Sequence, residues 1–389
     1  MPFTGKPTFA AGTDLPELVE DVSDVIGIVS PWETPLLDYL GDPKKAATST
    51  VHEWIEDTLL PNTDSLNQTT FTPDPQNATS LTVVNGTRFQ AGDLVRPDQS
   101  VEVMQVTSVV GNVLTVVRGY GSTVKATLAN GRRLFILGNA ALEGADAASA
   151  RFTNRVRRQN YTQIFAATVE VSGSMQATRQ HGTTDELDYQ KQERMRELLR
   201  DLESCVINGT APTSTPQGGA SVRRSMNGIV KQITTNVFTP GQSGFPAGGG
   251  AGTDLNELVL NSALRLAWEQ SSGQIDTIVV SGLQKRRINS FASTLRAYQP
   301  EDVKFRDLVG VYESDFGVCR VIMSRWVPAD TALLLDSSRI EVLPLRGRSF
   351  QYKPMGSTGD AIHGQVIGEY TMEFKNENAH AAIRGLSIT

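Results

Sequence analysis

The pattern of apolar and polar residues predicts a helix near the N-terminus. After Asp14, apolar residues recur every three or four positions, as on one face of a helix, and Glu17 completes a capping box with Asp14. They are Leu15, Leu18, Val19, Val22, Val25 and Ile26. The other face carries Glu20 and Asp24, and a short second helix is expected from Pro35 to Leu40. Segments this short form no core alone, so they must dock on something, and a neighbouring subunit is one candidate.

Two strands with a separate β module between them are predicted next. Residues 48 to 57 and 163 to 176 read as partner strands, the second because valines alternate with polar positions. The module between them covers residues 79 to 138. Its strands are Leu81 to Val84, Val101 to Val109, Val113 to Val117 and Leu134 to Leu137. Gly111-Asn112 has the composition of a two-residue hairpin turn, so we expect an all-β domain at the tip of a long hairpin.

The remainder of the chain predicts two lobes that mix helices and strands. The longest helix begins after Thr184-Asp185 and runs to about Asn208, and opposite charges three residues apart mark its outer face as solvated or interfacial. One lobe is expected from helices at 254–270 and 283–295, a strand at 275–281 and a hairpin of 309–313 with 318–323. Strands at 332–335, 340–345 and 364–374 are expected to build the other lobe beside the long helix.

Composition and charge narrow the classes of function. The chain has 389 residues and a formal net charge of -6, which argues against an overall basic nucleic-acid binder. Cys205 and Cys319 lie far apart and form no metal-ligand spacing, so we expect structural thiols and no disulfide framework. No basic start is followed by an apolar stretch and no run of 18 apolar residues occurs, so we expect a cytoplasmic product without a signal or membrane span.

Candidate chemistry is sparse. Gly248-Gly249-Gly250-Ala251-Gly252 before a helix resembles a phosphate-binding loop, but no strand precedes it and no Gly-Lys-Ser/Thr follows. Ser281 follows a strand, yet it lacks the glycine two residues earlier that a nucleophile elbow requires, so a helix N-cap is the better role. The four histidines are His52, His181, His363 and His380, and HExxH is absent. We therefore expect no catalytic residue, no metal and no cofactor.

Charged and aromatic residues supply the candidates for subunit contacts. Basic clusters occur at 132–133, 155–158, 223–224 and 285–287. Ordinary solvated charge is the favoured interpretation, while pairing of Lys285, Arg286 and Arg287 with acidic residues of a neighbour is the sharper hypothesis. The acidic candidates are Glu17, Glu20 and Asp24. Trp32 and Trp54 lie in segments that look too thin to bury them, which favours an intermolecular pocket.

A series of short motifs, in a consistent order along nearly the whole chain, resembles the major capsid proteins of tailed bacteriophages. The series opens with Ser30-Pro31-Trp32-Glu33-Thr34-Pro35-Leu36 and His52-Glu53-Trp54. It continues through residues 169–173, 279–281, 284–286, 311–317, 358–360, 368–371 and 376–380. No single motif is specific, but their order is.

The resemblance implies an α+β fold of the Hong Kong 97 type with an inserted β domain. It places an N-terminal arm at 1–45, the first strand of an extended loop at 46–78, the inserted domain at 79–138 and the return strand at 139–180. A spine helix of the peripheral domain would occupy 181–214, an axial domain 215–335 and peripheral strands 336–389. The resemblance leaves open whether the inserted domain projects from a shell or bridges subunits.

The function that the resemblance implies is structural. Such a protein self-assembles as hexamers and pentamers into an icosahedral shell around double-stranded DNA, is made in the host cytoplasm and resides in the virion. Scaffolding, portal and decoration proteins are candidate partners, with scaffolding expected to be a separate protein. The trio for a Lys-Asn cross-link cannot be matched, Lys125 lying in the inserted module. The alternatives are an encapsulin-like compartment that binds cargo peptides and, less favoured, a nucleotide-binding enzyme using residues 248–254.

Overall fold

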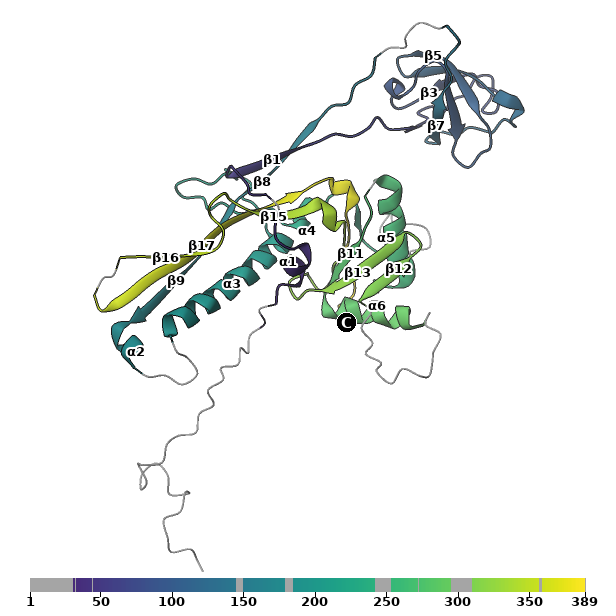
Figure 1. Ribbon diagram of the computed structural model, residues 1–389. Helices are drawn as coiled ribbons and strands as arrows, with labels where there is room; N and C mark the ends of the chain where they lie inside the picture. The colour runs from purple at the N-terminus through teal and green to yellow at the C-terminus, as the bar shows by residue number, and fades with distance from the viewer. Residues whose placement is uncertain are drawn as a thin grey trace, which may run out of the picture. The chain divides into compact units, whose positions relative to one another are not determined.

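The computed structural model describes residue 31 and residues 33–43, 45–144, 150–178, 185–241, 253–271, 273–294, 310–356 and 359–388 (Figure 1). The helix predicted after Asp14 and the Gly-rich segment at 248–252 lie outside these residues. The chain divides into two compact units, of which one is Ile55–Val156 and the other comprises the chain on either side of it.

The unit Ile55–Val156 contains a small closed antiparallel barrel. Its strands run in the order β2-β7-β4-β5-β6-β3, and a bridge between Leu66 and Val83 joins the two ends of that order. Their bounds are β2 Thr63–Ser65, β3 Ser80–Thr82, β4 Asp93–Pro97, β5 Met104–Val110, β6 Val113–Val117 and β7 Arg133–Asn139. Gly111 takes a φ of 60° in the turn between β5 and β6, as the Gly-Asn pair predicts.

The barrel starts earlier in the chain than the sequence predicts. The expected boundary at residue 79 leaves out β2, which pairs with β7, and β4 was not expected as a strand. A strand of three residues such as β2 is too short to show an alternating pattern. Its closing neighbour Leu66 is nevertheless buried in the same core as Leu81, Met104 and Leu114.

A buried ion pair completes the barrel interior. Arg118 Nε donates to Glu102 Oε1 at 2.7 Å and Arg118 Nη2 donates to Oε2 at 2.9 Å, with both side chains almost wholly buried. The same carboxylate accepts the backbone N–H groups of Gly119 and Ala126. Although burial raises the pKa of Glu102, the guanidinium and the backbone donors outweigh burial and hold that pKa below its usual range.

The long helix α3 (Glu186–Asn208) packs against a four-stranded sheet. Strand β17 (Ala361–Phe374) pairs along one edge with β15 (Ile340–Pro344) and β16 (Gln351–Pro354), and along the other with β9 (Gln163–Ser172). A short helix, α2 (Gly173–Ala177), follows β9, and Figure 1 shows α3 running along this sheet. The predicted lobe beside the long helix is therefore present for the strands at 340–345 and 364–374. The strand expected there at 332–335 was wrongly placed, because it pairs within a different, six-stranded sheet.

The predicted partner of the first hairpin strand was wrong. Strand β1 (Val51–Glu56) pairs with β8 (Val156–Tyr161), while β9 pairs with β17 over ten residues. The apolar positions of β9 explain this choice, because Phe165, Val169 and Val171 are buried in one core with α3. That burial is available only in the sheet of β17 and not in a two-stranded ribbon.

A second sheet, in the order β10-β18-β14-β11-β13-β12, lies between two cores. Its strands are β10 Val237–Phe238, β11 Thr277–Val280, β12 Val311–Ser314, β13 Gly317–Met323, β14 Ala332–Leu335 and β18 Ala381–Ile383. Alternate residues of β11 face different cores: Val279 lies with α3, whereas Ile278 and Val280 lie with α5 (Glu257–Gln270). Helix α6 (Gly282–Thr294) follows β11.

Two short segments depart from the expected division of the chain. Strand β18 pairs with β14 and β10 and so belongs to this second sheet, although residues 336–389 were all expected among the peripheral strands. Helix α4 (Ile229–Gln232) packs against α3, although residues 215–335 were expected in the axial domain. Segments of three and four residues carry too little periodicity to assign them to a lobe from sequence. Helix α1 (Pro35–Leu40) matches its predicted bounds and buries Leu36.

A substitution at Gly228 tests how closely the backbone before α4 packs against the end of α3. A Cβ atom there would lie 2.6 Å from the Gly209 nitrogen and 2.8 Å from the carbonyl oxygens of Cys205 and Ile207, all of which are backbone atoms. We expect Gly228→Ala to lower the free energy of unfolding by about 1–3 kcal/mol, because backbone cannot move aside as a side chain does. Urea denaturation measures this. Gly219→Ala, where the nearest atom is 3.9 Å away, is the control, and equal stability of the two variants would contradict the packing.

A substitution at Arg118 tests how much the buried ion pair with Glu102 contributes to the stability of the barrel. We expect Arg118→Met to destabilise the barrel by about 3–5 kcal/mol, because it leaves Glu102 buried without its cation. The double variant Glu102→Gln with Arg118→Met is expected to lose less, since no buried charge remains. The single and the double variant are compared by denaturation of the full chain, with hydrogen exchange of residues 102–118 as the readout for the barrel. Arg155→Ala, which breaks an exposed contact of 3.9 Å with Asp57, is the control and is expected to change little.

Candidate functional site

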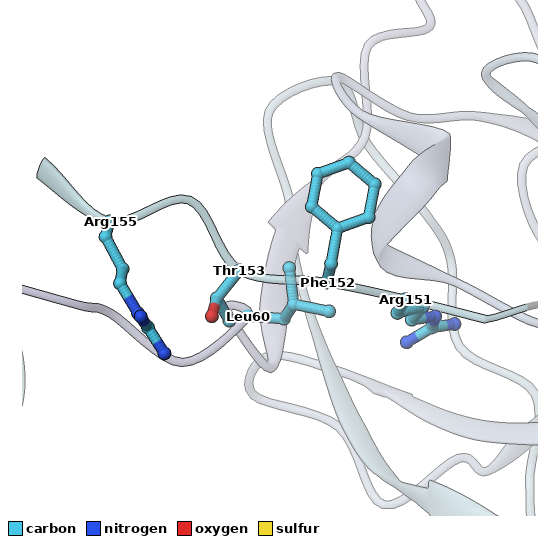
Figure 2. A pocket seen from close by; sticks show the side chains of 5 residues that line it. All are labelled: Leu60, Arg151, Phe152, Thr153 and Arg155. Atoms are coloured by element: carbon cyan, nitrogen blue, oxygen red, sulfur yellow. The ribbon is translucent and has the colours of Figure 1, made fainter.

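The chain segments that lead into and out of the barrel expose large apolar side chains. Leu59 is 90% exposed, Leu142 83% and Phe152 79%. An open hollow there is lined by Leu60 from the outgoing segment and by residues 151, 152, 153 and 155 from the returning one (Figure 2). Single exposed apolar residues are ordinary, but several on one thin pair of segments indicate a surface that another molecule covers. We refer to residues 55–62, 140–144 and 150–156 as the arm.

Polar side chains hold the two segments of the arm together. Thr153 Oγ1 donates to Asp57 Oδ2 at 2.8 Å, and Arg155 Nε lies 3.9 Å from the same oxygen. Arg151 Nη2 lies 3.8 Å from Asp93 Oδ2 of β4. The contacts of Asp57 are largely solvent-exposed and therefore weak. They align the two segments, but the arm has no apolar core of its own.

The base of β1 is anchored by a buried carboxylate on β17. Glu373 Oε2 lies 2.6 Å from Lys45 Nζ and 2.9 Å from His52 Nε2, and Glu373 Oε1 lies 3.1 Å from Lys375 Nζ. Burial raises the pKa of Glu373, but these three partners outweigh burial and hold that pKa at about 2. The His-Glu-Trp motif thus has a structural role: His52 binds Glu373, and Glu53 lies 3.4 Å from Arg157 of β8.

A second buried carboxylate on β17 joins three loops. Glu369 accepts a hydrogen bond of 2.6 Å from Thr162 Oγ1 and contacts Arg224 at 2.6 Å and Arg348 at 3.0 Å. Our sequence reasoning missed both Glu369 and Glu373. Their signal was present, because two acids lie four residues apart in a strand that has no other acidic or basic residue except His363, and buried acids require partners.

Trp54 is buried within its own chain. It is 8% exposed and lies in the core with Phe165 and Val169 of β9. The premise that its segment was too thin to bury it was wrong, because β1 lies over the core that α3 and β9 build. Its role as a subunit contact stays a prediction without that support.

Two of the three basic residues at the start of α6 have partners in their own chain. Lys285 Nζ donates to the Val321 carbonyl at 3.1 Å, and burial lowers the pKa of Lys285. Arg287 donates to Ser387 and lies 3.1 Å from Asp254. Arg286 is exposed, so it keeps the strongest claim to a contact with another subunit. The acidic candidates Glu17, Glu20 and Asp24, together with Trp32, lie outside the described residues.

The described histidines and cysteines form no metal site. No group of three or more His, Cys, Asp or Glu side chains in the described part of the chain is arranged to hold a metal ion. His380 is buried against the Phe374 ring at 4.2 Å, and burial lowers its pKa to about 4. Ser281 directly precedes α6, where its carbonyl accepts the Lys285 N–H at 2.9 Å, and its Oγ donates to the Ala329 carbonyl. This is the predicted N-cap position. Among the helices that the structure describes, none is long and apolar enough to cross a membrane.

Comparison with solved structures identifies the fold. The capsid of an empty GTA particle aligns with a TM-score of 0.52 and 10% identity, over 98% of this chain and 99% of that one. The capsid of a native GTA particle aligns with a TM-score of 0.50 and 10% identity over the same shares. At this identity the likeness shows the fold alone, and it confirms the predicted α+β fold of the Hong Kong 97 type.

Sequence comparison identifies the family. The major capsid protein of Escherichia phage Phieco32 is 36% identical over 75 residues, which are 19% of this chain and only 21% of that relative's length. The family model described as SU10 major capsid protein matches residues 3–387. Since that match covers nearly the whole chain, the protein belongs to the SU10 major capsid protein family.

Proposed function

We propose that this protein is the principal shell subunit of a phage head, which assembles from hexamers and pentamers around double-stranded DNA. The observation that carries the proposal is the arm, whose exposed Leu59, Leu142 and Phe152 have no cover within the described part of their own chain. A neighbouring copy that covers them removes apolar surface from water and stabilises the contact.

The parts of the chain take the following roles in this proposal. Residues 1–45 act as an N-terminal arm, and the barrel unit is an insertion in the extended loop whose strands are β1 and β8. The sheet of β17 with α3 serves as the peripheral domain, and the sheet of β11 with α5 and α6 serves as the axial domain. Membership of a major capsid protein family supports a structural, non-enzymatic role.

The partners and location follow from the same role. A shell subunit is made in the host cytoplasm and resides in the virion, where scaffolding, portal and decoration proteins are its candidate partners. The net charge of -6 supports a shell that encloses DNA without binding it tightly, because a basic interior surface would hold the phosphate backbone.

Self-assembly is the direct test of the proposal. We expect light scattering of the purified chain to rise steeply above a threshold concentration, and negative-stain images of the heaviest fraction to show shells, tubes or capsomer rings. Threshold behaviour follows because each subunit makes several contacts at once. A monodisperse monomer at every concentration and salt condition tried would overturn the proposal.

Variants of the arm test where the contact lies. We expect Leu59→Ser with Phe152→Ser to raise the threshold concentration at least about tenfold, because burying one such side chain contributes about 1.5–3 kcal/mol and 1.4 kcal/mol is a factor of ten. The unfolding midpoint should stay unchanged, since both residues are exposed in the subunit. Val110→Ser with Val124→Ser is the matched control, because both valines are 74% exposed on the barrel. An equal rise in the control would show that the arm is not the specific contact.

A further inference from the structure

Glu203 of α3 stands apart among the buried carboxylates of the described chain. Seven acidic residues are buried there, and six have a cation within 4 Å. These pairs are Asp64 with Arg88, Asp93 with Arg151, Glu102 with Arg118, Asp336 with Arg339, Glu369 with Arg224 and Glu373 with Lys45. Glu203 is 0% exposed and has no such cation among the described residues. A buried acid without a cation is costly to ionise.

The hydrogen bonds of Glu203 join three elements. Its Oε2 accepts the backbone N–H groups of Leu36 at 3.2 Å and Leu37 at 3.3 Å, and its Oε1 accepts the Ser324 hydroxyl at 3.0 Å. Leu36 and Leu37 belong to the first turn of α1, and Ser324 directly follows β13. One side chain on the long helix therefore fastens α1 and the end of the second sheet.

Glu203 also supplies the N-terminal cap that α1 lacks. The first N–H groups of a helix have no partner within the helix. Thr34 occupies the N-cap position but makes no capping hydrogen bond, and its Oγ1 donates to Asp38 at 3.3 Å. Pro35 has no N–H to satisfy. The docking of α1 on the body thus depends on a carboxyl group from a distant part of the sequence.

The charged groups on the surrounding elements are engaged elsewhere. Near α1 these are Glu33 and Asp38. Arg325 lies 3.2 Å from Glu33, and Arg320 of β13 lies over the Tyr39 ring at 5.0 Å. On α3 itself, Arg200 lies 3.2 Å from Asp201. Apart from its three hydrogen-bond donors and the nearby Asp38 carboxylate, the environment of Glu203 is therefore apolar.

Burial dominates the titration of Glu203. It raises the pKa from 4.5 to about 7, and the nearby charge of Asp38 adds to the rise. The donors at Leu37, Ser324 and Leu36 favour the ionised form but do not offset burial. The carboxyl therefore changes charge near neutral pH while α1 is docked.

We propose that Glu203 makes the docking of α1 proton-linked, so that α1 is held when the carboxyl is protonated and opens more often when it is ionised. The undocked carboxyl is hydrated and titrates near its ordinary value, whereas the docked carboxyl titrates near neutrality. The stabilisation is fully present below pH 4.5 and is lost progressively as the pH rises towards 7. Above about pH 7 both states are ionised, and the opening equilibrium no longer changes with pH.

The consequence concerns the position of α1 itself. Proton binding at Glu203 sets how often this helix opens from α3 and from the end of β13. This device does not depend on shell assembly, so it is tested on the unassembled chain, and its failure would leave the proposed function untouched.

Hydrogen exchange of the α1 amides at different pH values is the test. After division by the intrinsic exchange rate, we expect protection of residues 36–40 to fall up to about tenfold per pH unit between pH 5 and pH 7, the limit for one linked proton, and to level off above it. Glu203→Gln keeps the shape and one acceptor without a titrating group, so its protection should not change with pH. The matched control Glu197→Gln, at an exposed i,i+3 pair with Arg194 on the same helix, should keep the wild-type profile.

Ser324→Ala provides a second test, which is available even if Glu203→Gln fails to fold. Ser324→Ala removes a donor to the ionised carboxyl, so it should move the levelling of the profile to higher pH. Wild-type protection that is flat between pH 5 and pH 7 would overturn the proposal. A Glu203→Gln profile equal to that of the wild type, or an unmoved profile in Ser324→Ala, would also overturn it.

Discussion

Helix α3 lies on the sheet of β9 and β17, and its buried Leu198, Leu202 and Val206 form one core with Phe165 and Val169. The other elements of the larger unit depend on this contact. Leu36 of α1 and Trp54 of β1 are buried in this core. Strand β11 reaches the same core through Val279 and a second core through Ile278, so the two sheets are tied together by a strand buried on both faces.

At the edge of this core, contacts between charged side chains hold the surrounding segments in place. Glu369 and Glu373 are held on β17 between Arg, Lys and His partners, and they fix the loops and the base of β1 around the sheet. Buried charges of this kind add little net stability, because desolvation offsets much of their attraction, whereas loss of one partner is costly. Glu203 is the exception, since hydrogen bonds replace the cation and its charge state becomes sensitive to pH. The subunit therefore combines fixed anchors with one adjustable attachment.

The arm, in contrast to the core of α3, β9 and β17, leaves large apolar side chains exposed. Its two segments are aligned by Asp57 with Thr153 and Arg155, yet they leave Leu59 and Phe152 in water. A protein that only had to fold would gain by removing these side chains. Their proposed burial between subunits would account for their presence, and it is consistent with membership of a capsid protein family. On this proposal, stability of the subunit and stability of the shell depend on different apolar surfaces.

The sequence by itself determined the long elements and the family. The periodicity of α3, α5 and α6, the turn at Gly111-Asn112 and the order of short motifs predicted most elements and the Hong Kong 97-type fold. Only the tertiary structure decided that β9 pairs with β17, that β2 and β18 join their sheets, and that Trp54 is buried. The physical reason is the range of the signal. Periodicity reports local burial over many residues, whereas strand partners, three-residue strands and the partners of a buried acid such as Glu203 depend on residues far along the chain.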